Sequence, residues 1–236
     1  MKHRTRVVLQ LAAFCFVLAA HGFAADDAYL YVVNGIPGRD IAANFNPDFP
    51  VDILISGVCQ SHGLAFGSTD GPLTFSPGTY EVQISEANTL APCTNPSIID
   101  SQVTLTGAAS VSAVAAVSTG EATLLQFADS TSKVTAANAR FVLSHAADAG
   151  ELLATLTQVG VTNPKTFSVT ADPEKEGTLT VPAGLYLVQV VVDGSATVLA
   201  SETISLADQS ATFTYAAGEA ANSSVSLINK TVLGLF

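Results

Sequence analysis

Basic residues are scarce in this chain, and tryptophan is absent from it. The 236 residues include nine lysines and arginines against 20 aspartates and glutamates, which gives a formal net charge of −11. Residues 1–24 hold three of the nine basic residues and none of the acidic ones, so the rest of the chain has six basic against 20 acidic residues, a net charge of −14. Such a surface repels nucleic acids and anionic lipids. We therefore expect no nucleic-acid partner.

Cysteine and histidine are also scarce, which narrows the choice of metal and redox chemistry. After residue 24 the cysteines are Cys59 and Cys93, and the histidines are His62 and His145. Two thiols in an oxidising compartment pair, so a Cys59–Cys93 disulfide is predicted. A metal site that uses Cys59 and His62 is the alternative, although no Cys-x-x-Cys pair supports it. We assign no metal ligands and expect no cofactor.

Long apolar runs are missing after residue 24, so no transmembrane segment is predicted in the mature chain. Residues 1–24 themselves begin with basic positions, continue with an apolar stretch from Val7 to Ala20 and end with small residues, an order typical of a secretory signal peptide. We predict cleavage after Ala24. Lipidation of Cys15 is the alternative, and the apolar sequence that continues beyond Cys15 argues against it.

Catalytic signatures are not evident in the sequence. A Gly-x-Ser-x-Gly nucleophile motif does not occur, and His62 and His145 fall in different halves of the chain. The densest acidic cluster, Asp172–Gly177, contains a proline and a lysine that break the spacing of a calcium loop. A solvated hairpin tip is the favoured interpretation of this cluster. We expect no enzymatic activity and assign no catalytic residues.

Apolar and polar residues alternate along much of the chain, as they do in half-buried strands. Within residues 79–85, for example, Tyr80, Val82 and Ile84 share one face. The same pattern marks residues 29–33, 51–55, 111–117 and 211–215. Many short strands separated by glycine, proline and asparagine turns are typical of β-sandwiches, so an all-β fold is predicted.

The motif Gly-x-Tyr-x-Val-Gln occurs twice, at residues 78–83 and 184–189, and each copy follows a proline closely. The repeat pairs Gly78 with Gly184, Tyr80 with Tyr186, and Val82 with Val188. We interpret it as the core strand of two tandem units, with the tyrosines pointing inward. The predicted domains are residues 26–130 and 138–236, joined by a linker at 131–137 that is short enough to make the units pack.

The second copy of the motif is apolar on both of its faces. Leu185 and Leu187 stand where the first copy has Thr79 and Glu81. A strand that is apolar on both sides needs cover on both sides. We expect the first unit or a loop to provide that cover, and a surface for a partner is the alternative.

Three segments resemble a known family. Val51–Gly57, Leu64–Gly67 and Ser76–Tyr80 are similar to motifs of the secreted bacterial repeat known as domain of unknown function 4397. Ser144–Asp148 resembles a turn of that family, which would place His145 in a turn. The resemblance covers nearly all of the mature chain and is clearer in the first unit.

The resemblance implies an immunoglobulin-like or transthyretin-like β-sandwich, and it implies a strand at residues 153–157 that matches residues 51–55. It implies no catalytic residues. Combined with the signal peptide, it indicates a protein of the bacterial periplasm or the cell exterior.

Together these observations predict two tandem immunoglobulin-like antiparallel β-sandwich domains without enzymatic activity. A structural, adhesion or interaction module is the expected function, with an unknown protein or polysaccharide of the cell envelope as partner. A ligand-binding module for a carbohydrate or a metal ion is the alternative. The apolar C-terminal residues 228–236 are expected to pair with their own sheet, and self-association by strand addition is the alternative.

Overall fold

The computed structural model describes residues 26–41, 46 and 48–233. The predicted signal peptide, its cleavage point and Cys15 therefore lie outside the described residues. Among the described residues, no helix is both long enough and apolar enough to span a membrane.

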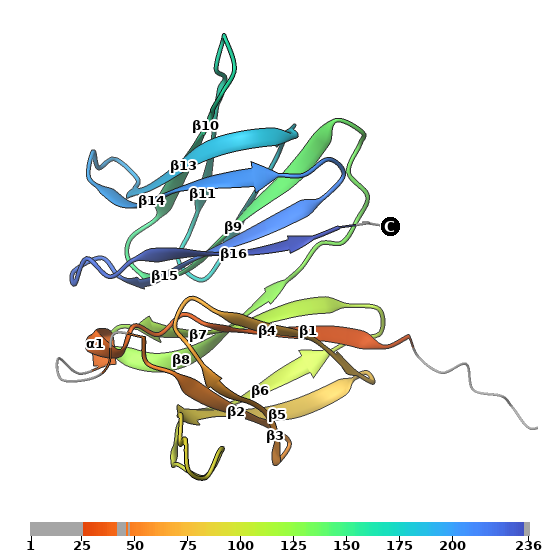
Figure 1. The fold of residues 1–236 in the computed structure, drawn as a ribbon, viewed down its shortest axis with the longest axis vertical. Helices are drawn as coiled ribbons and strands as arrows, with labels where there is room; N and C mark the ends of the chain where they lie inside the picture. The colour runs from red at the N-terminus through yellow and green to blue at the C-terminus, as the bar shows by residue number, and fades with distance from the viewer. Residues whose placement is uncertain (1–25, 42–45, 47, 234–236) are drawn as a thin grey trace, which may run out of the picture.

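Nearly all of the regular secondary structure in the described chain is β-strand (Figure 1). The first half contains β1 (Ala28–Asn34), the short helix α1 (Gly38–Ile41), β2 (Val51–Ile55), β3 (Val58–Leu64), β4 (Thr69–Phe75), β5 (Gly78–Glu86), β6 (Ser97–Leu105), β7 (Ser110–Ser118) and β8 (Glu121–Ala128). The second half contains β9 (Asn138–Asp148), β10 (Leu152–Gln158), β11 (Thr166–Ala171), β12 (Glu176–Pro182), β13 (Gly184–Val192), β14 (Val198–Leu206), β15 (Ala211–Glu219) and β16 (Ser226–Val232). The all-β prediction is confirmed, and β10 contains the strand that the family resemblance implied.

The two halves have the same topology. In the first half the sheets have the strand orders β4-β1-β7-β8 and β3-β2-β5-β6, and in the second half the orders β12-β9-β15-β16 and β11-β10-β13-β14. Each strand of the first half thus corresponds to the strand eight places later. Most pairings are antiparallel, as expected, but β1 with β7 and β9 with β15 are parallel. The repeated motif of the sequence therefore marks a repeated fold.

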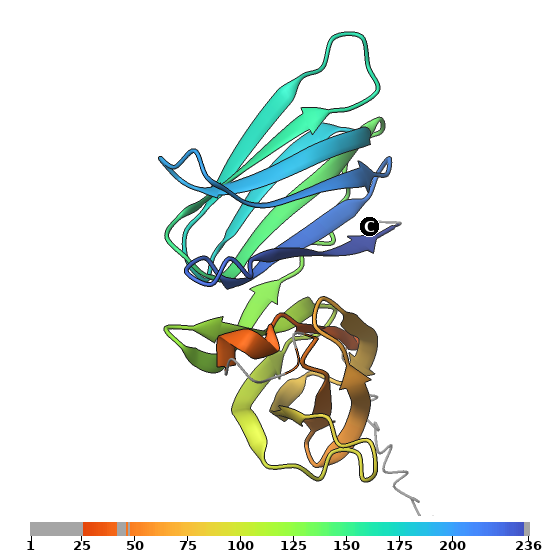
Figure 2. The same cartoon turned by 60° about the vertical axis from the view of Figure 1, so that its left-hand side comes forward.

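Each half is a sandwich of two sheets around its own core (Figures 1 and 2). The motif strands β5 and β13 occupy equivalent central positions in their sheets. Val82 and Val188 are fully buried, and Tyr186 is fully buried while Tyr80 is partly buried. The hydroxyl of Tyr80 donates to the backbone carbonyl of Ser76 at 2.7 Å, and the hydroxyl of Tyr186 donates to that of Pro182 at 2.8 Å. Both tyrosines thus fasten the strand to the residue four places before them.

A third apolar cluster lies between the two sandwiches, where sheet β4-β1-β7-β8 faces sheet β12-β9-β15-β16 (Figure 1). The first sandwich contributes Val33, Val114, Ala116 and Phe127, and the second contributes Val142, Ala146, Ala211, Phe213, Tyr215, Ala217 and Ile228. Val134, from the segment between β8 and β9, is buried in the same cluster. Part of the predicted linker therefore packs inside the interface.

The interface explains why β7 and β15 show so little alternation of polar and apolar residues. One face of each strand lines the core of its own sandwich, while the other face contacts the opposite sandwich, so nearly every residue is buried. Small side chains allow the sheets to approach closely. A Cβ atom added at Gly35 would lie only 2.8 Å from the Cβ of Ala217 in the other sandwich.

The expected cover for the second face of β13 is not what the structure shows. The first sandwich contacts β9, β15 and β16, whereas β13 lies in the sheet on the far side of the second sandwich (Figure 1). Leu185 is 44% exposed, and Leu187 and Val191 are partly exposed. The prediction was wrong because the apolar character of this strand says that a face needs cover but not which surface supplies it.

Two further expectations have clear outcomes in the structure. The predicted disulfide joins Cys59 in β3 to Cys93 in the loop between β5 and β6. The C-terminal segment pairs with its own sheet through β16, which lies beside β15 as far as Val232, while residues 234–236 lie outside the described residues.

Candidate functional site

The most unusual polar group of the interface is a buried lysine. Lys230 lies in β16 between Ile228 and Val232, and these three residues share the face that contacts the first sandwich. Its partner, Asp129, directly follows β8 and continues the inward phase of Leu125 and Phe127. The alternation of two strands from different sandwiches thus brings one cation and one anion into an apolar interface.

Lys230 and Asp129 form a close ion pair. The Nζ atom of Lys230 lies 2.6 Å from Oδ2 of Asp129, and the side chains are only 6% and 0% exposed. Lysine and aspartate are seldom this deeply buried unless they are paired. The pair therefore connects the last strand of the second sandwich to the end of the last strand of the first.

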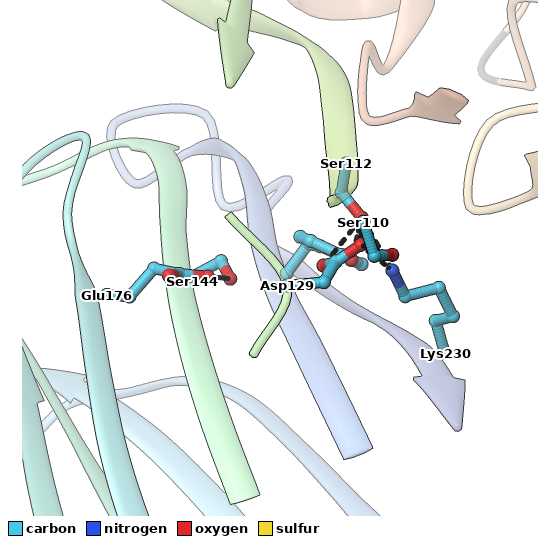
Figure 3. Close-up of polar contacts among 7 residues, drawn as sticks. Ser110, Ser112, Asp129, Ser144, Glu176 and Lys230 are labelled. Carbon is cyan, nitrogen blue, oxygen red and sulfur yellow. Dashed lines mark hydrogen bonds and ion pairs between the residues drawn. The ribbon is translucent and has the colours of Figure 1, made fainter. Parts of the chain in front are cut away.

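Two serines of β7 complete the coordination of Asp129 (Figure 3). The hydroxyl of Ser110 donates to Oδ2 at 2.9 Å, and the hydroxyl of Ser112 contacts Oδ1 at 2.9 Å and Oδ2 at 3.0 Å. The Oγ atom of Ser112 also lies 2.6 Å from Nζ of Lys230 and 2.6 Å from the hydroxyl of Tyr215. Ser112 is thus the common neighbour of the amine, the carboxyl group and the phenol.

Aromatic rings surround the ammonium group on its remaining sides. Nζ of Lys230 lies 3.8 Å from the ring centroid of Tyr31 and 4.6 Å from that of Phe213. The ring of Tyr215 follows at 6.0 Å. Ring faces attract a cation while excluding water from it, so the charge of Lys230 is held in a nearly dry cage.

Burial shifts the protonation equilibria of this cluster. It lowers the pKa of Lys230, while the negative charge of Asp129 opposes that shift. Burial also raises the pKa of Tyr215, and the charge of Asp129 adds to that increase. Lys230 therefore loses its proton to give the neutral amine more readily than a surface lysine does.

A second acidic group borders the cluster. Glu176 of β12 lies opposite Ser144 of β9, and the Ser144 hydroxyl donates to its carboxylate at 2.9 Å (Figure 3). Burial raises the pKa of Glu176, with a further increase from the charge of Asp129, while the bond from Ser144 lowers it. This part of the interface therefore brings the carboxyl groups of Asp129 and Glu176 close to the amine of Lys230.

Another polar contact links the sandwiches at the opposite edge of the interface. Asp40 of α1 accepts a hydrogen bond from the backbone NH of Glu219 at 3.1 Å and one from the hydroxyl of Ser224 at 2.5 Å. The side-chain amide of Asn222 also donates to Asp40 at 3.1 Å. Two polar bridges thus flank the apolar cluster and fix how the sandwiches are oriented.

The histidine that the family resemblance placed in a turn lies in a strand instead. His145 belongs to β9 and is fully buried, because β9 continues its parallel pairing with β15 as far as Asp148. Its Nε2 atom lies 2.8 Å from the carbonyl oxygen of Gly150, whereas Nδ1 is buried without a hydrogen-bond partner. Ser144, its neighbour, points to the opposite face toward Glu176. The two residues therefore do not form a catalytic pair.

The structure does not bring the remaining candidate ligands together. Both cysteines are consumed by the disulfide, and His62 is exposed on β3. Within residues 26–41, 46 and 48–233, no group of three or more histidine, cysteine, aspartate or glutamate side chains could hold a metal ion. Asp172–Lys175 form a turn between β11 and β12. These two strands lie in different sheets, so the turn is a crossover between sheets and not the predicted hairpin tip, and Glu176 and Gly177 belong to β12.

Sequence reasoning missed Asp129, Lys230 and Ser112, although one signal for them exists. Lys230 alternates in phase with Ile228 and Val232, so it takes an inward position in an apolar strand. A lysine in that phase, in a chain with so few basic residues, indicates a buried partner of opposite charge. Which carboxylate provides that charge is not visible locally, because the partners are 101 residues apart.

Comparison with known proteins gives a family match and several structural similarities. A family model described as a domain of unknown function, DUF4397, matches residues 28–155. This match spans β1 to β9 and part of β10, less than the motif resemblance had indicated. No curated protein sequence matches the chain.

Solved structures resemble the chain only distantly. The Bacillus anthracis TIE protein has a TM-score of 0.26 and 8% identity over 87% of this chain and 34% of its own. A candidate adhesin from Bacteroides ovatus has a TM-score of 0.27 and 11% identity, over 89% of this chain and 94% of its own. A candidate cell adhesion protein from Bacteroides ovatus ATCC 8483 has a TM-score of 0.25 and 10% identity, over 89% of this chain and 97% of its own. The chain spans about a third of the length of the Bacillus anthracis protein. At such TM-scores the similarities carry no argument about the site.

Proposed function

The chain belongs to the DUF4397 family, and we propose that it is a secreted, non-enzymatic module that serves a structural or adhesive role in the cell envelope or outside the cell. The observation that carries this proposal is the buried interface between the two sandwiches. Apolar packing, the Lys230–Asp129 pair and the Asp40 bridge together hold the sandwiches at one orientation.

A fixed orientation suits a protein that presents surfaces at a set spacing. The equivalent sheets of the two repeats face each other, so their outer sheets, which contain β5 and β13, point away from the interface (Figure 1). Loops and outer faces are then available for contacts, while the interface itself supplies stiffness. The disulfide suits an oxidising compartment such as the periplasm or the exterior.

The outer face of β13 is the surface that we expect to contact an envelope partner, either a protein or a polysaccharide. Leu185, Leu187, Gln189 and Val191 on this face carry no charge, although the chain as a whole is strongly acidic. The equivalent face of β5 carries Glu81. The two copies of one strand have therefore diverged most on the side that does not build the core.

Binding to isolated envelopes tests this function. The purified full chain, labelled with a fluorophore, is expected to bind washed envelopes of its host in a saturable manner. Leu185→Asp should weaken that binding at least tenfold, because it places a charge on the apolar face. Thr79→Asp, the same substitution at the equivalent position of the first sandwich, is the matched control and should leave binding unchanged.

Two results would contradict the proposal. The first is the absence of saturable binding to envelopes. The second is recovery of the native chain in the cytosolic fraction of the host rather than in the periplasm or the medium. Equal loss of binding in both aspartate variants would move the contact surface away from β13.

A further inference from the structure

The buried cluster places a primary amine against a carboxyl group at a site that water hardly reaches. The contact of 2.6 Å joins Nζ of Lys230 to Oδ2 of Asp129, and the carbon that an amine would attack is bonded directly to that oxygen. Strand β16 and the end of β8 hold the two groups, so their approach needs no further loss of motional freedom. Such fixed proximity gives intramolecular reactions their large rate advantage.

We propose that Lys230 and Asp129 condense to an amide, so that an intramolecular cross-link joins the two sandwiches of the mature protein. The ion pair of the structure is the state that precedes the bond. This inference concerns the covalent state of the interface and holds whether or not the chain acts as an envelope module.

A proton transfer between the two groups is the first requirement of the reaction, because an ammonium ion has no lone pair with which to attack a carboxylate. A proton must pass from Nζ of Lys230 to Oδ2 of Asp129 along their contact, which yields an amine and a carboxylic acid. Burial favours this transfer, since two charges are removed from an apolar surrounding. The lowered pKa of Lys230 agrees with the same preference for the neutral amine.

The bond-forming step then balances with groups that the cluster already holds. The lone pair of Nζ attacks Cγ of Asp129 to form the C–N bond. A second nitrogen proton passes to Oγ of Ser112, at 2.6 Å, and Ser112 releases its own proton to Oδ2, at 3.0 Å. The Cγ–Oδ2 bond breaks, and Oδ2 leaves as water with both protons. Nζ keeps one hydrogen, Oδ1 becomes the amide oxygen, and no oxidant or further reactant is needed.

The surroundings favour the product over the ion pair. An amide is neutral, so its formation removes the penalty of keeping a lysine and an aspartate away from water. The rings of Tyr31 and Phe213 shield the bond from water that would hydrolyse it. A surface cleft lined by Tyr31, Ser110 and Val232 reaches the cluster and offers a route for the released water.

Peptide mapping of the purified wild-type chain tests the cross-link directly. The protein is denatured, its disulfide is reduced, and it is digested with trypsin and a glutamate-specific protease. We expect residues 122–133 and 220–236 to appear as one linked species whose mass is the sum of the two peptides minus one water, about 18 Da. Trypsin should not cut after Lys230, because its amine is acylated.

Two variants serve as controls in the same experiment. Lys230→Arg keeps a cation in the cluster, but its guanidinium group does not form this amide, so only unlinked peptides are expected. Ser112→Ala removes the proton relay while leaving both reacting groups, and the linked fraction should rise at least tenfold more slowly after synthesis.

The outcomes decide the proposal. Recovery of the linked species from the wild type and not from Lys230→Arg supports it. Wild-type protein that yields residues 122–133 and 220–230 as separate peptides, with complete cleavage after Lys230, overturns it without reference to any variant. Equal rates of linkage in Ser112→Ala and the wild type would overturn the role of Ser112 as the relay.

Discussion

Replacing Lys230 with methionine should destabilise the protein far more than any change at an exposed lysine. Methionine keeps most of the length and apolar contact of the lysine stem, so packing against Tyr31 and Phe213 changes little. What is lost is the group that neutralises Asp129, either as an ion pair or as the inferred amide, and the side chain of Asp129 is 0% exposed. The carboxylate would keep only the donors Ser110 and Ser112.

The size of the effect follows from the burial of the pair. Removing one partner of a buried ion pair generally costs about 3–5 kcal/mol, because an uncompensated charge stays behind. For a chain of roughly 200 residues, each kcal/mol lowers the melting temperature by about 2–4 °C. We therefore expect Lys230→Met to lower the melting temperature by about 6–20 °C.

Calorimetry on the full chain measures this shift, with Lys133→Met as the matched control. Lys133 is exposed in the segment between β8 and β9, so its replacement should change the melting temperature by no more than about 2 °C. The double variant Lys230→Met with Asp129→Leu removes both charges and should melt above Lys230→Met alone, because no uncompensated carboxylate then stays in the interface. If Lys230→Met melts within about 2 °C of the wild type, the pair does not hold the interface and the reasoning is refuted.

Three other predictions concern single side chains. Tyr186→Phe should lower the free energy of unfolding by about 1 kcal/mol, and Tyr80→Phe should lower it by less. Both hydroxyl groups donate to the carbonyl four residues earlier, but only Tyr186 is fully buried. Urea denaturation measures both effects, and equal effects would contradict the argument. Burial lowers the pKa of His145, so the unfolded chain binds a proton on this histidine more readily than the folded chain does. The native state should therefore lose stability as the pH falls below about 6.5. Denaturation at a series of pH values should show this loss in the wild type and a smaller loss in His145→Gln. Val188→Thr should lower the free energy of unfolding by about 1–3 kcal/mol, because it buries a hydroxyl group without a partner. Leu187→Thr on the outer face should lower it by no more than about 1 kcal/mol. The reverse order would mean that β13 has been placed with the wrong face inward.

The sequence allowed the strands and the class of fold to be predicted because these depend on local pattern. Alternation in β5 places Val82 inward wherever the strand lies in the fold. The Cys59–Cys93 disulfide could be predicted equally well, since these are the only cysteines after residue 24. Features of this kind need no knowledge of which strands become neighbours.

The interface was harder to predict from the sequence, because it depends on how whole sheets pack against each other. Strand β7 is rich in alanine and valine, and β15 consists mainly of alanine, threonine and aromatic residues. These compositions suggest that both faces of each strand are buried, but they do not show which surface covers them. The same ambiguity led to the wrong cover for the outer face of β13. Lys230 could be recognised as an inward lysine, but its partner Asp129 becomes visible only when the two sandwiches are in place.

The distance between the two sandwiches tests most directly whether the buried interface fixes their orientation. Spin labels can be attached at Gln102→Cys on β6 and Ser168→Cys on β11, which are exposed positions on the outer sheets of the two sandwiches. Pulsed electron paramagnetic resonance on this doubly labelled chain should give one narrow distance distribution. A broad or multimodal distribution would contradict the account, because it would show that the sandwiches move independently despite the apolar cluster and the Lys230–Asp129 pair.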